Sequence, residues 1–335
     1  MLHVMRALIL GSLLFSVATA EEYKTTVVLS GLNNPCGVAV HPSGRVYVAE
    51  SGALQVVRVN KVGENAKAVP VITDFPKDVY GKGPMYDIGP LGLAFLTGKM
   101  LIVGGGGNPD GSELLRVYEL PKGRETIKAE QMKYSLGPME PGEATSKGEG
   151  NFYGLAVDNR GIYVTANGDD TKGWVLKAPL KKKVPQGLEP FIATKEAVMV
   201  DAPVGITICS EGNLVVGQMG EITVPLDSLV TVYDAKSGQM LNNYRTNLFD
   251  IAAMGTSPSG GIYALDFAWM DTTQGSLSKI EMSAGEAEVT KLMSLDKPTA
   301  MAFDKEGRMF VTVIGTPEDG SDKPNGKLLM IEGDF

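Results

Sequence analysis

Pro-Cys-Gly-Val-Ala-Val-His-Pro-Ser-Gly-Arg-Val-Tyr-Val-Ala-Glu, residues 35–50, decides the fold because the chain repeats it. The clearest second copy is Gly-Ile-Thr-Ile-Cys-Ser-Glu-Gly-Asn-Leu-Val-Val at residues 205–216. Looser copies start at Gly92, Gly154, Ala253 and Ala300. Their regular spacing along the chain is typical of four-stranded propeller blades. The six copies therefore predict an all-β, six-bladed β-propeller.

Each copy has the pattern of antiparallel β-strands. In the first, apolar segments rich in β-branched residues alternate with short polar turns, which predicts strands at 36–40, 45–50, 55–60 and 68–73. Residues 24–30 read as a further strand that belongs to no copy, and the last copy lacks its fourth strand. We therefore expect residues 24–30 to complete the sixth blade and close the ring. A sandwich of short strands is the alternative, which the repeated sequence disfavours.

Residues 1–20 have the features of a secretory signal peptide. Arg6 precedes an apolar run over residues 7–18, and Ala-Thr-Ala ends the segment. This run is shorter than the roughly 20 apolar residues that a spanning helix needs, so a retained membrane anchor is the weaker interpretation. We expect cleavage after Ala20 and an extracytoplasmic protein, periplasmic or secreted, with one domain over residues 21–335.

The net charge limits which partners the protein can bind, and the positions of the two cysteines decide whether they can form a disulfide. The net charge of −8 argues against nucleic acid or an anionic membrane surface as a partner, and we expect a monomer. Cys36 and Cys209 fall in blades 1 and 4, which face each other across the channel, and at opposite ends of it. Because a disulfide needs Cα atoms within about 7 Å, both cysteines are predicted to be free thiols.

Long connections gather at one end of the predicted ring, where the innermost strands begin; we call this end the top face. Loops on a rigid scaffold are common binding sites. The side chains expected at the mouth of the channel are Tyr86, Asp87, Phe152, Tyr153, Phe267 and Trp269. Aromatic groups with a polar rim are typical of ligand-binding surfaces, although Phe152 and Tyr153 fit packing between blades equally well.

A divalent cation is a competing ligand for the same face. Several top-face loops are rich in Asp, Asn and Gly, which suits Ca²⁺ but also suits ordinary turns. The candidate metal ligands are Glu50, Gln218 and Asp266, which end the second strands of blades 1, 4 and 5; solvated strand ends are the alternative interpretation. Histidine chemistry is disfavoured, because the only histidine after the signal segment, His41, falls on a turn at the opposite end.

The repeat Pro-x-Gly-Val-Ala-Val-x-Pro-Ser-Gly-Arg-Val-Tyr-Val-Ala-Glu resembles NHL-repeat and gluconolactonase-like (senescence-marker-type) six-bladed propellers. Residues 27–35, Val-Val-Leu-Ser-Gly-Leu-Asn-Asn-Pro, are similar to exported propellers associated with scytonemin gene clusters. The resemblance covers nearly all of the chain after the signal segment and implies the fold. It does not select an activity, because this superfamily includes lactonases, lyases, sugar dehydrogenases and binding modules.

The resemblance also implies where a metal would lie. Gluconolactonase-like enzymes hold a divalent cation with Glu, Asn or Asp, commonly just before the glycine that starts an inner strand. Here those positions carry no carboxylate and no amide; they hold Cys36, Leu91, Tyr153, Val204, Ala252 and Thr299.

Two functional hypotheses follow. The first is an exported binding or scaffolding module without a cofactor or a catalytic residue, which takes a protein, a carbohydrate or a small molecule at its top face. The second is a Ca²⁺-type, metal-dependent hydrolase of the lactonase class, in which Glu50 and Asp266, with Asp87, hold a cation whose bound water is the nucleophile.

Overall fold

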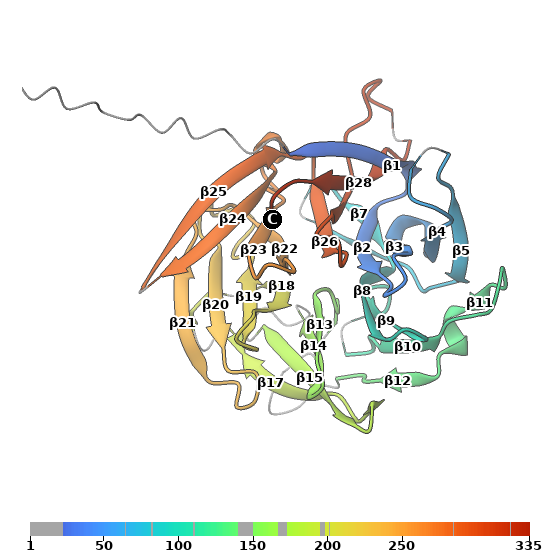
Figure 1. The fold of residues 1–335 in the computed structure, drawn as a ribbon, viewed down its shortest axis with the longest axis horizontal. Coiled ribbons are helices and arrows are strands. Elements are labelled where there is room, and N and C mark those ends of the chain that lie inside the picture. Colours follow the sequence, from blue (N-terminus) through green and yellow to red (C-terminus); the bar gives the residue numbers. More distant parts are fainter. Residues whose placement is uncertain are drawn as a thin grey trace, which may run out of the picture.

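The computed structural model describes residues 23–335 except 64, 82, 110, 140–149, 167–172, 195–197, 201, 284 and 322. The chain forms six β-sheets arranged around a central channel, so the predicted six-bladed propeller is confirmed (Figure 1). The predicted signal peptide, residues 1–20, lies outside the described residues. None of the helical segments in the described part is long and apolar enough to cross a membrane.

Each blade has four main antiparallel strands, which follow one another from the channel outwards. Blades 1 to 3 contain β2 (Pro35–Val40), β3 (Val46–Glu50), β4 (Gln55–Val59) and β5 (Ala68–Thr73); β8 (Pro90–Thr97), β9 (Met100–Gly105), β10 (Leu115–Glu119) and β12 (Tyr134–Leu136); and β13 (Leu155–Val157), β14 (Gly161–Ala166), β15 (Trp174–Lys181) and β17 (Glu189–Ala193). Blades 4 to 6 contain β18 (Pro203–Ile208), β19 (Leu214–Gln218), β20 (Leu229–Tyr233) and β21 (Met240–Arg245); β22 (Ile251–Thr256), β23 (Ile262–Asp266), β24 (Ser276–Ser283) and β25 (Glu286–Ser294); and β26 (Pro298–Phe303), β27 (Met309–Val313), β28 (Gly326–Glu332) and β1 (Lys24–Leu32).

The ring closes as the sequence predicts. Strand β1 pairs antiparallel with β28, with Thr26 opposite Met330, so the first strand is the outer strand of the sixth blade (Figure 1). The Thr299 hydroxyl of blade 6 donates a hydrogen bond to the carbonyl oxygen of Pro35 in blade 1, at 2.7 Å. Closure therefore joins the two ends of the chain both at the outer edge and beside the channel.

Small additions depart from the four-stranded pattern. Strand β11 (Ile127–Lys128) adds to the outer edge of blade 1 in parallel with β5, and β16 (Val184–Pro185) pairs with the end of β15. Strands β6 (Asp78–Tyr80) and β7 (Tyr86–Ile88) form a hairpin of their own in the connection from blade 1 to blade 2.

The turns between first and second strands explain why the sequence repeats. The amide of His41 donates to the carbonyl oxygen of Arg45 at 2.8 Å, and the amide of Cys209 donates to that of Asn213 at 3.0 Å. Gly44 and Gly212 occupy the same left-handed conformation in the two turns, with φ of 82° and 78°, which glycine adopts at little cost. These turns lie at the end opposite the top face, which we call the bottom face.

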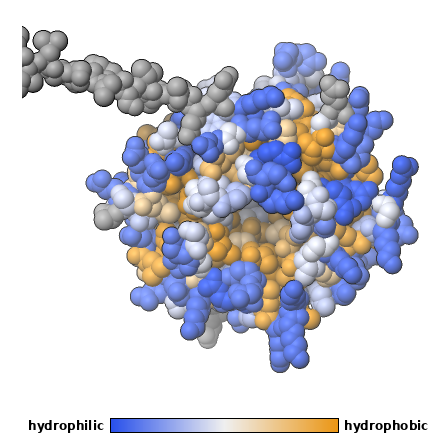
Figure 2. Space-filling view, viewed as in Figure 1, coloured by the Kyte–Doolittle hydropathy of each residue, from blue (hydrophilic) through white to orange (hydrophobic). Residues whose placement is uncertain are grey.

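Glycine also allows the innermost strands to approach one another. A Cβ atom on Gly37, Gly92 or Gly154 would overlap a backbone carbonyl oxygen of the next blade. The first four blades therefore meet backbone to backbone around the channel, and the apolar core fills the wedges between blades farther out. Figure 2 shows the ring hollowed at its centre on the face in view, with hydrophilic residues around its periphery.

Both cysteines are free thiols, as predicted. Cys36 is buried beside the channel, and Cys209 is half-buried in the bottom-face turn of blade 4.

Candidate functional site

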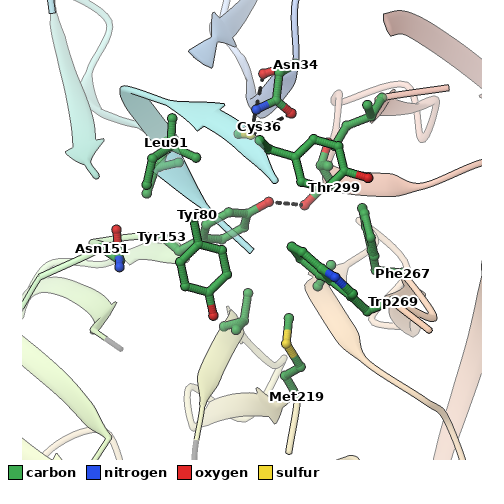
Figure 3. Close-up of a pocket in the computed structure, with 15 residues that line it drawn as sticks. Asn34, Cys36, Tyr80, Leu91, Asn151, Tyr153, Met219, Phe267, Trp269 and Thr299 are labelled. Atoms are coloured by element: carbon green, nitrogen blue, oxygen red, sulfur yellow. Dashed lines mark hydrogen bonds between the residues drawn. The ribbon is translucent and has the colours of Figure 1, made fainter. Parts of the chain in front are cut away.

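A cavity of about 90 Å³ lies at the mouth of the channel. Every blade contributes one residue from the beginning of its innermost strand, or from just before it in blade 3. These residues are Cys36, Leu91, Tyr153, Val204, Ala252 and Thr299. Figure 3 shows several of these side chains directed towards a common space. One position of the repeat therefore forms a ring at the mouth, and the side chains at that position set its chemistry.

Tyr153 forms a floor beneath part of this cavity. Its side chain crosses the channel from blade 3 to blade 6, where its hydroxyl donates a hydrogen bond to the Thr299 carbonyl oxygen at 3.1 Å (Figure 3). A smaller space of about 50 Å³ continues down the channel between the innermost strands.

Two top-face segments build the walls above the ring. The β6–β7 hairpin contributes Tyr80 and Tyr86, which lie opposite each other across the two strands, together with Ile88. The loop after β23 contributes Phe267 and Trp269. Residues from the connection between blades 1 and 2 and from blade 5 therefore meet over the channel.

Trp269 packs edge to face against two tyrosines and at a tilt against Phe267. The Trp269 ring lies 5.9 Å from Tyr80 and 5.6 Å from Tyr86, with interplanar angles of 85° and 84°, and 4.9 Å from Phe267. Such arrangements match the charge distribution of aromatic rings and stabilise their relative orientation. The Trp269 amide also donates a hydrogen bond to a carboxylate oxygen of Asp250, which fixes the loop.

The polar groups of the lining are few and uncharged. Asn34, Asn151 and Thr299 contribute amides and a hydroxyl, and no acidic or basic side chain is among the lining residues that the structure describes. The Tyr86 hydroxyl and the Trp269 Nε1 are buried, and neither has a hydrogen-bond partner among the described residues. The wall therefore contains two unused donors.

Burial suppresses acid–base chemistry in this lining. It raises the pKa of the Cys36 thiol to about 12, and it raises the pKa of Tyr86 to about 12, with a further contribution from the negative charge of Asp296. Burial also raises the pKa of Tyr153 well above its usual value. All three groups keep their protons at neutral pH, so the thiol is no nucleophile and the phenols are no bases.

The structure brings together four of the six side chains expected at the mouth. Tyr86, Tyr153, Phe267 and Trp269 line the cavity, but Phe152 does not. Phe152 is fully buried and packs in the core between blades 2 and 3, so the alternative of packing between blades, and not a place at the mouth, holds for this residue.

Asp87 also lies outside the lining. Its carboxylate forms an ion pair with Lys77 at 2.7 Å on the surface, because alternate residues of β7 face opposite sides. Sequence analysis missed Tyr80 and Ile88, which the same alternation places with Tyr86 on the cavity side.

The three candidate metal ligands form hydrogen bonds with backbone groups and with a neighbouring side chain instead. Glu50 accepts a hydrogen bond from the Asn33 amide at 2.8 Å, and Asp266 accepts one from the Asp250 amide at 2.7 Å. Gln218 accepts from the Thr231 hydroxyl at 2.7 Å and donates to the Val200 carbonyl oxygen at 2.9 Å. All three side chains are buried, so they are not solvated strand ends either.

The described residues include no group of three or more His, Cys, Asp or Glu side chains placed to hold a metal ion.

No protein-family model and no curated protein matches this sequence. Solved structures with a similar fold include a PQQ-bound aldose sugar dehydrogenase from Streptomyces coelicolor, at 13% identity over 93% of this chain and 99% of that one, with a TM-score of 0.61. A gluconolactonase from Xanthomonas campestris is 10% identical over 96% and 93% of the two chains, with a TM-score of 0.62. A streptogramin B lyase is 12% identical over 94% and 98%, with a TM-score of 0.54. Identities this low establish the fold alone, and the chain is a six-bladed β-propeller whose fold is similar to that of gluconolactonases and of these other propeller enzymes.

Proposed function

We propose that this protein is a binding module that receives an apolar group, preferably an aromatic ring, in the mouth cavity. The observation that carries the proposal is the lining itself, which is mostly aromatic and aliphatic and whose described residues include no charged side chain. Burial of apolar surface supplies about 25 cal/mol per Å², and aromatic pairs add about 0.5–1.5 kcal/mol. Affinity at this site therefore comes from apolar contact and shape.

The size of the cavity limits what enters it. A volume of about 90 Å³ is smaller than the roughly 150 Å³ of an apolar cavity that holds benzene. The site therefore accepts the edge of one ring or one branched alkyl group, and the remainder of the ligand stays above the mouth. The bound group thus belongs to a larger molecule, either a small organic ligand or a side chain of a partner protein.

The unused donors indicate which ring fits best. A buried donor without an acceptor costs about 1–3 kcal/mol. A ring that carries an oxygen acceptor reduces this cost when small rotations of Tyr86 or Trp269 bring a donor to it. We therefore expect phenolic or carbonyl-bearing rings to bind better than plain hydrocarbons.

The surface around the mouth supports contact with a larger partner. Met85, which immediately precedes β7 of the hairpin, is 57% exposed, and Met270, beside Trp269, is 67% exposed. Flexible methionine side chains adapt to varied apolar partners. This suits a scaffolding role at the top face, and the leader-like segment at the start of the chain suits such a role outside the cytoplasm.

The hydrolase alternative fits this chain less well. The ring positions at the mouth carry no carboxylate, and the carboxylates of Glu50 and Asp266 are occupied by backbone amides. PQQ, which the aldose sugar dehydrogenase binds, is anionic, and the described residues of the lining include no Lys, Arg or His to hold it. Neither a divalent cation nor this quinone matches the described lining.

Fluorescence of Trp269 tests the proposal. The chain has two tryptophans, and Trp174→Phe removes the one that lies outside the cavity lining. Titration of this variant with phenol should give a saturable change in emission with a dissociation constant of ~1 mM, the range for so small a ligand. Benzyl alcohol and toluene then compare rings with and without an oxygen.

A blocked cavity is the matched control. Ala252→Leu in the Trp174→Phe background fills the space with a side chain from the ring itself, whereas Val184→Leu changes an exposed residue on β16. Binding should be lost in the first and kept in the second, with both variants showing the circular dichroism of the parent. Equal phenol binding by both variants would show that the ring enters elsewhere and would end the proposal.

Metal dependence is checked by melting. A ligand that binds only the folded state raises the melting temperature. Residues 21–335 should melt within about 1 °C of the same temperature in excess EDTA and in millimolar Ca²⁺. A shift of several degrees would instead support the hydrolase alternative.

A further inference from the structure

A second concave region lies far from the mouth, on the bottom face between blades 1 and 2. It has a volume of about 1170 Å³ and is lined by segments from both blades. Six of its lining side chains are basic: Arg45, Arg58, Lys67, Lys99, Lys122 and Arg124. We call this region the basic groove. It stands out in a chain whose 39 acidic residues outnumber its 31 basic ones.

The basic side chains come from five separate segments of the fold. Arg45 follows the first turn of blade 1, Arg58 lies on β4, and Lys67 precedes β5. Lys99 lies in the first turn of blade 2, and Lys122 and Arg124 follow β10. The propeller therefore assembles the charge from parts of the chain that are distant in sequence.

The charge in the groove is not neutralised within the protein. None of the six basic side chains forms an ion pair with a residue that the structure describes. Glu119, the one acidic residue among those described in the lining, already pairs with Lys133 at 2.9 Å. The pair with Lys133 lowers the pKa of Glu119, and the positive charges of Lys99 and Lys122 lower it further. These lysines therefore lie close enough together to attract the same negative charge.

The two arginines of blade 1 are partly positioned. An Arg58 guanidinium nitrogen donates to the Gly123 carbonyl oxygen across the groove at 3.2 Å, and the Arg45 Nε donates to the Ser43 hydroxyl at 3.1 Å. Both retain further N–H groups for a ligand. Arginine forks bind carboxylate and sulfate oxygens in pairs, and partial positioning lowers the entropy cost of doing so.

We infer that the basic groove binds a linear acidic polysaccharide through its carboxylate groups. An extended polymer can reach cations that lie on five separate segments of the fold, whereas a small anion would contact only a few of them. A bilayer is flat and would need exposed apolar residues to insert, and none of the large exposed hydrophobic residues of the described chain lies in the groove. Single-stranded nucleic acid binds to exposed aromatic rings, but Tyr47, the only aromatic residue in the described lining, is 2% exposed.

Binding of polygalacturonate to the protein comprising residues 21–335 tests the inference. Isothermal titration at low salt should show binding of polygalacturonate and none of the neutral polymer dextran. The groove variant carries Arg45→Gln, Lys99→Gln and Lys122→Gln. Three exposed surface pairs contribute up to about 1 kcal/mol each, so we expect the variant to bind about tenfold more weakly or worse.

The matched control removes the same charge elsewhere. Lys24→Gln, Lys236→Gln and Lys323→Gln alter three exposed lysines outside the groove, and this variant should bind within about twofold of the parent. All the substituted residues are exposed, and unchanged melting temperatures confirm that both variants fold. Equal weakening in the two variants, or no binding of polygalacturonate by the parent, overturns the inference. Tighter binding to oligo-dT or to vesicles with anionic phospholipid than to polygalacturonate also overturns it.

Discussion

The mouth cavity and the basic groove lie on opposite faces of the same ring, and they shift the pKa of a nearby carboxylate in opposite directions. Behind the mouth, burial raises the pKa of Asp250 to about 7, with further contributions from Asp266 and Asp227. In the groove, Lys133 and two further lysines lower the pKa of Glu119. One region disfavours negative charge and the other attracts it.

The same repeat unit produces both environments because its two ends are built differently. At the top, the ring position of each blade faces the channel beneath a hairpin and a loop, and most of the side chains there are buried. At the bottom, short turns project charged side chains such as Arg45 and Lys99 into solvent. The rigid inner strands separate the two regions, and ligands at one are expected to leave the other unchanged.

The largest expected difference concerns backbone packing. A Cβ on Gly92, just below the mouth, would overlap the carbonyl oxygen of Tyr153, whereas a Cβ on Gly98, in the groove, would make ordinary contact with His41 at 3.5 Å. Gly92→Ala should lower the free energy of unfolding by about 3 kcal/mol or more, because neither backbone can move aside easily.

The matched variant Gly98→Ala should change the free energy of unfolding by less than about 1 kcal/mol. Urea denaturation of both variants measures the difference. Similar stability losses would mean that the mouth is not more tightly packed than the groove.

The second largest expected difference is in how salt affects ligand affinity at the two sites. Attraction between exposed charges is screened over about 10 Å at 0.1 M salt and over about 3 Å at 1 M, whereas apolar burial is not screened. Raising NaCl from about 50 mM to about 500 mM should weaken polygalacturonate binding about a hundredfold and leave phenol binding within about twofold. Titrations of both ligands at both salt concentrations provide the measurement. A phenol affinity that falls in parallel with that of polygalacturonate would argue against an uncharged mouth site.

The stability of the mouth should depend on pH through Asp250. Its pKa rises from an ordinary value of 3.8 to about 7 in the folded protein. Between these values the folded chain keeps a proton that the unfolded chain has lost, so stability is full at low pH and decreases as the pH rises towards 7. Asp266, whose pKa burial also raises, contributes in the same direction.

Asp250→Asn removes the larger part of this dependence. The amide oxygen still accepts from the Trp269 amide, and the group no longer titrates. The variant should therefore lose less stability between pH 5 and pH 8 than the parent and should melt higher at pH 8, by a few degrees. Asp271→Asn, on the exposed part of the same loop, serves as the control, and an unchanged pH profile in Asp250→Asn would disprove the assignment.

The fold was predictable because its signal is repeated. The turns after the inner strands of blades 1 and 4 have the same length and the same glycine position, Gly44 and Gly212. Ring closure followed from one unmatched strand, β1. The β6–β7 hairpin was not predicted. It occurs once, and nothing in the repeat marks the pairing of Tyr80 with Tyr86.

The site was only partly predictable, for a physical reason. The repeat located the ring position in every blade, but it could not show which way neighbouring side chains point. Phe152 and Tyr153 are adjacent, and one packs between blades while the other crosses the channel. Likewise, Glu50 ends a strand as a ligand would, but its oxygens are used by the amide of Asn33 and the side chain of Gln55.

The smallest predicted effect concerns the unused donors of the mouth. Tyr86→Phe removes a buried hydroxyl that has no described partner, whereas Tyr118→Phe removes one that donates to the Ala129 carbonyl oxygen at 2.7 Å. Without ligand, Tyr86→Phe should leave the free energy of unfolding unchanged or raise it by up to about 1 kcal/mol, and Tyr118→Phe should lower it by about 1 kcal/mol. In the Trp174→Phe background, Tyr86→Phe should also reduce the preference for phenol over toluene. If it destabilises the protein as much as Tyr118→Phe does, the Tyr86 hydroxyl already has a partner, and the preference for rings with an acceptor must then rest on Trp269 alone.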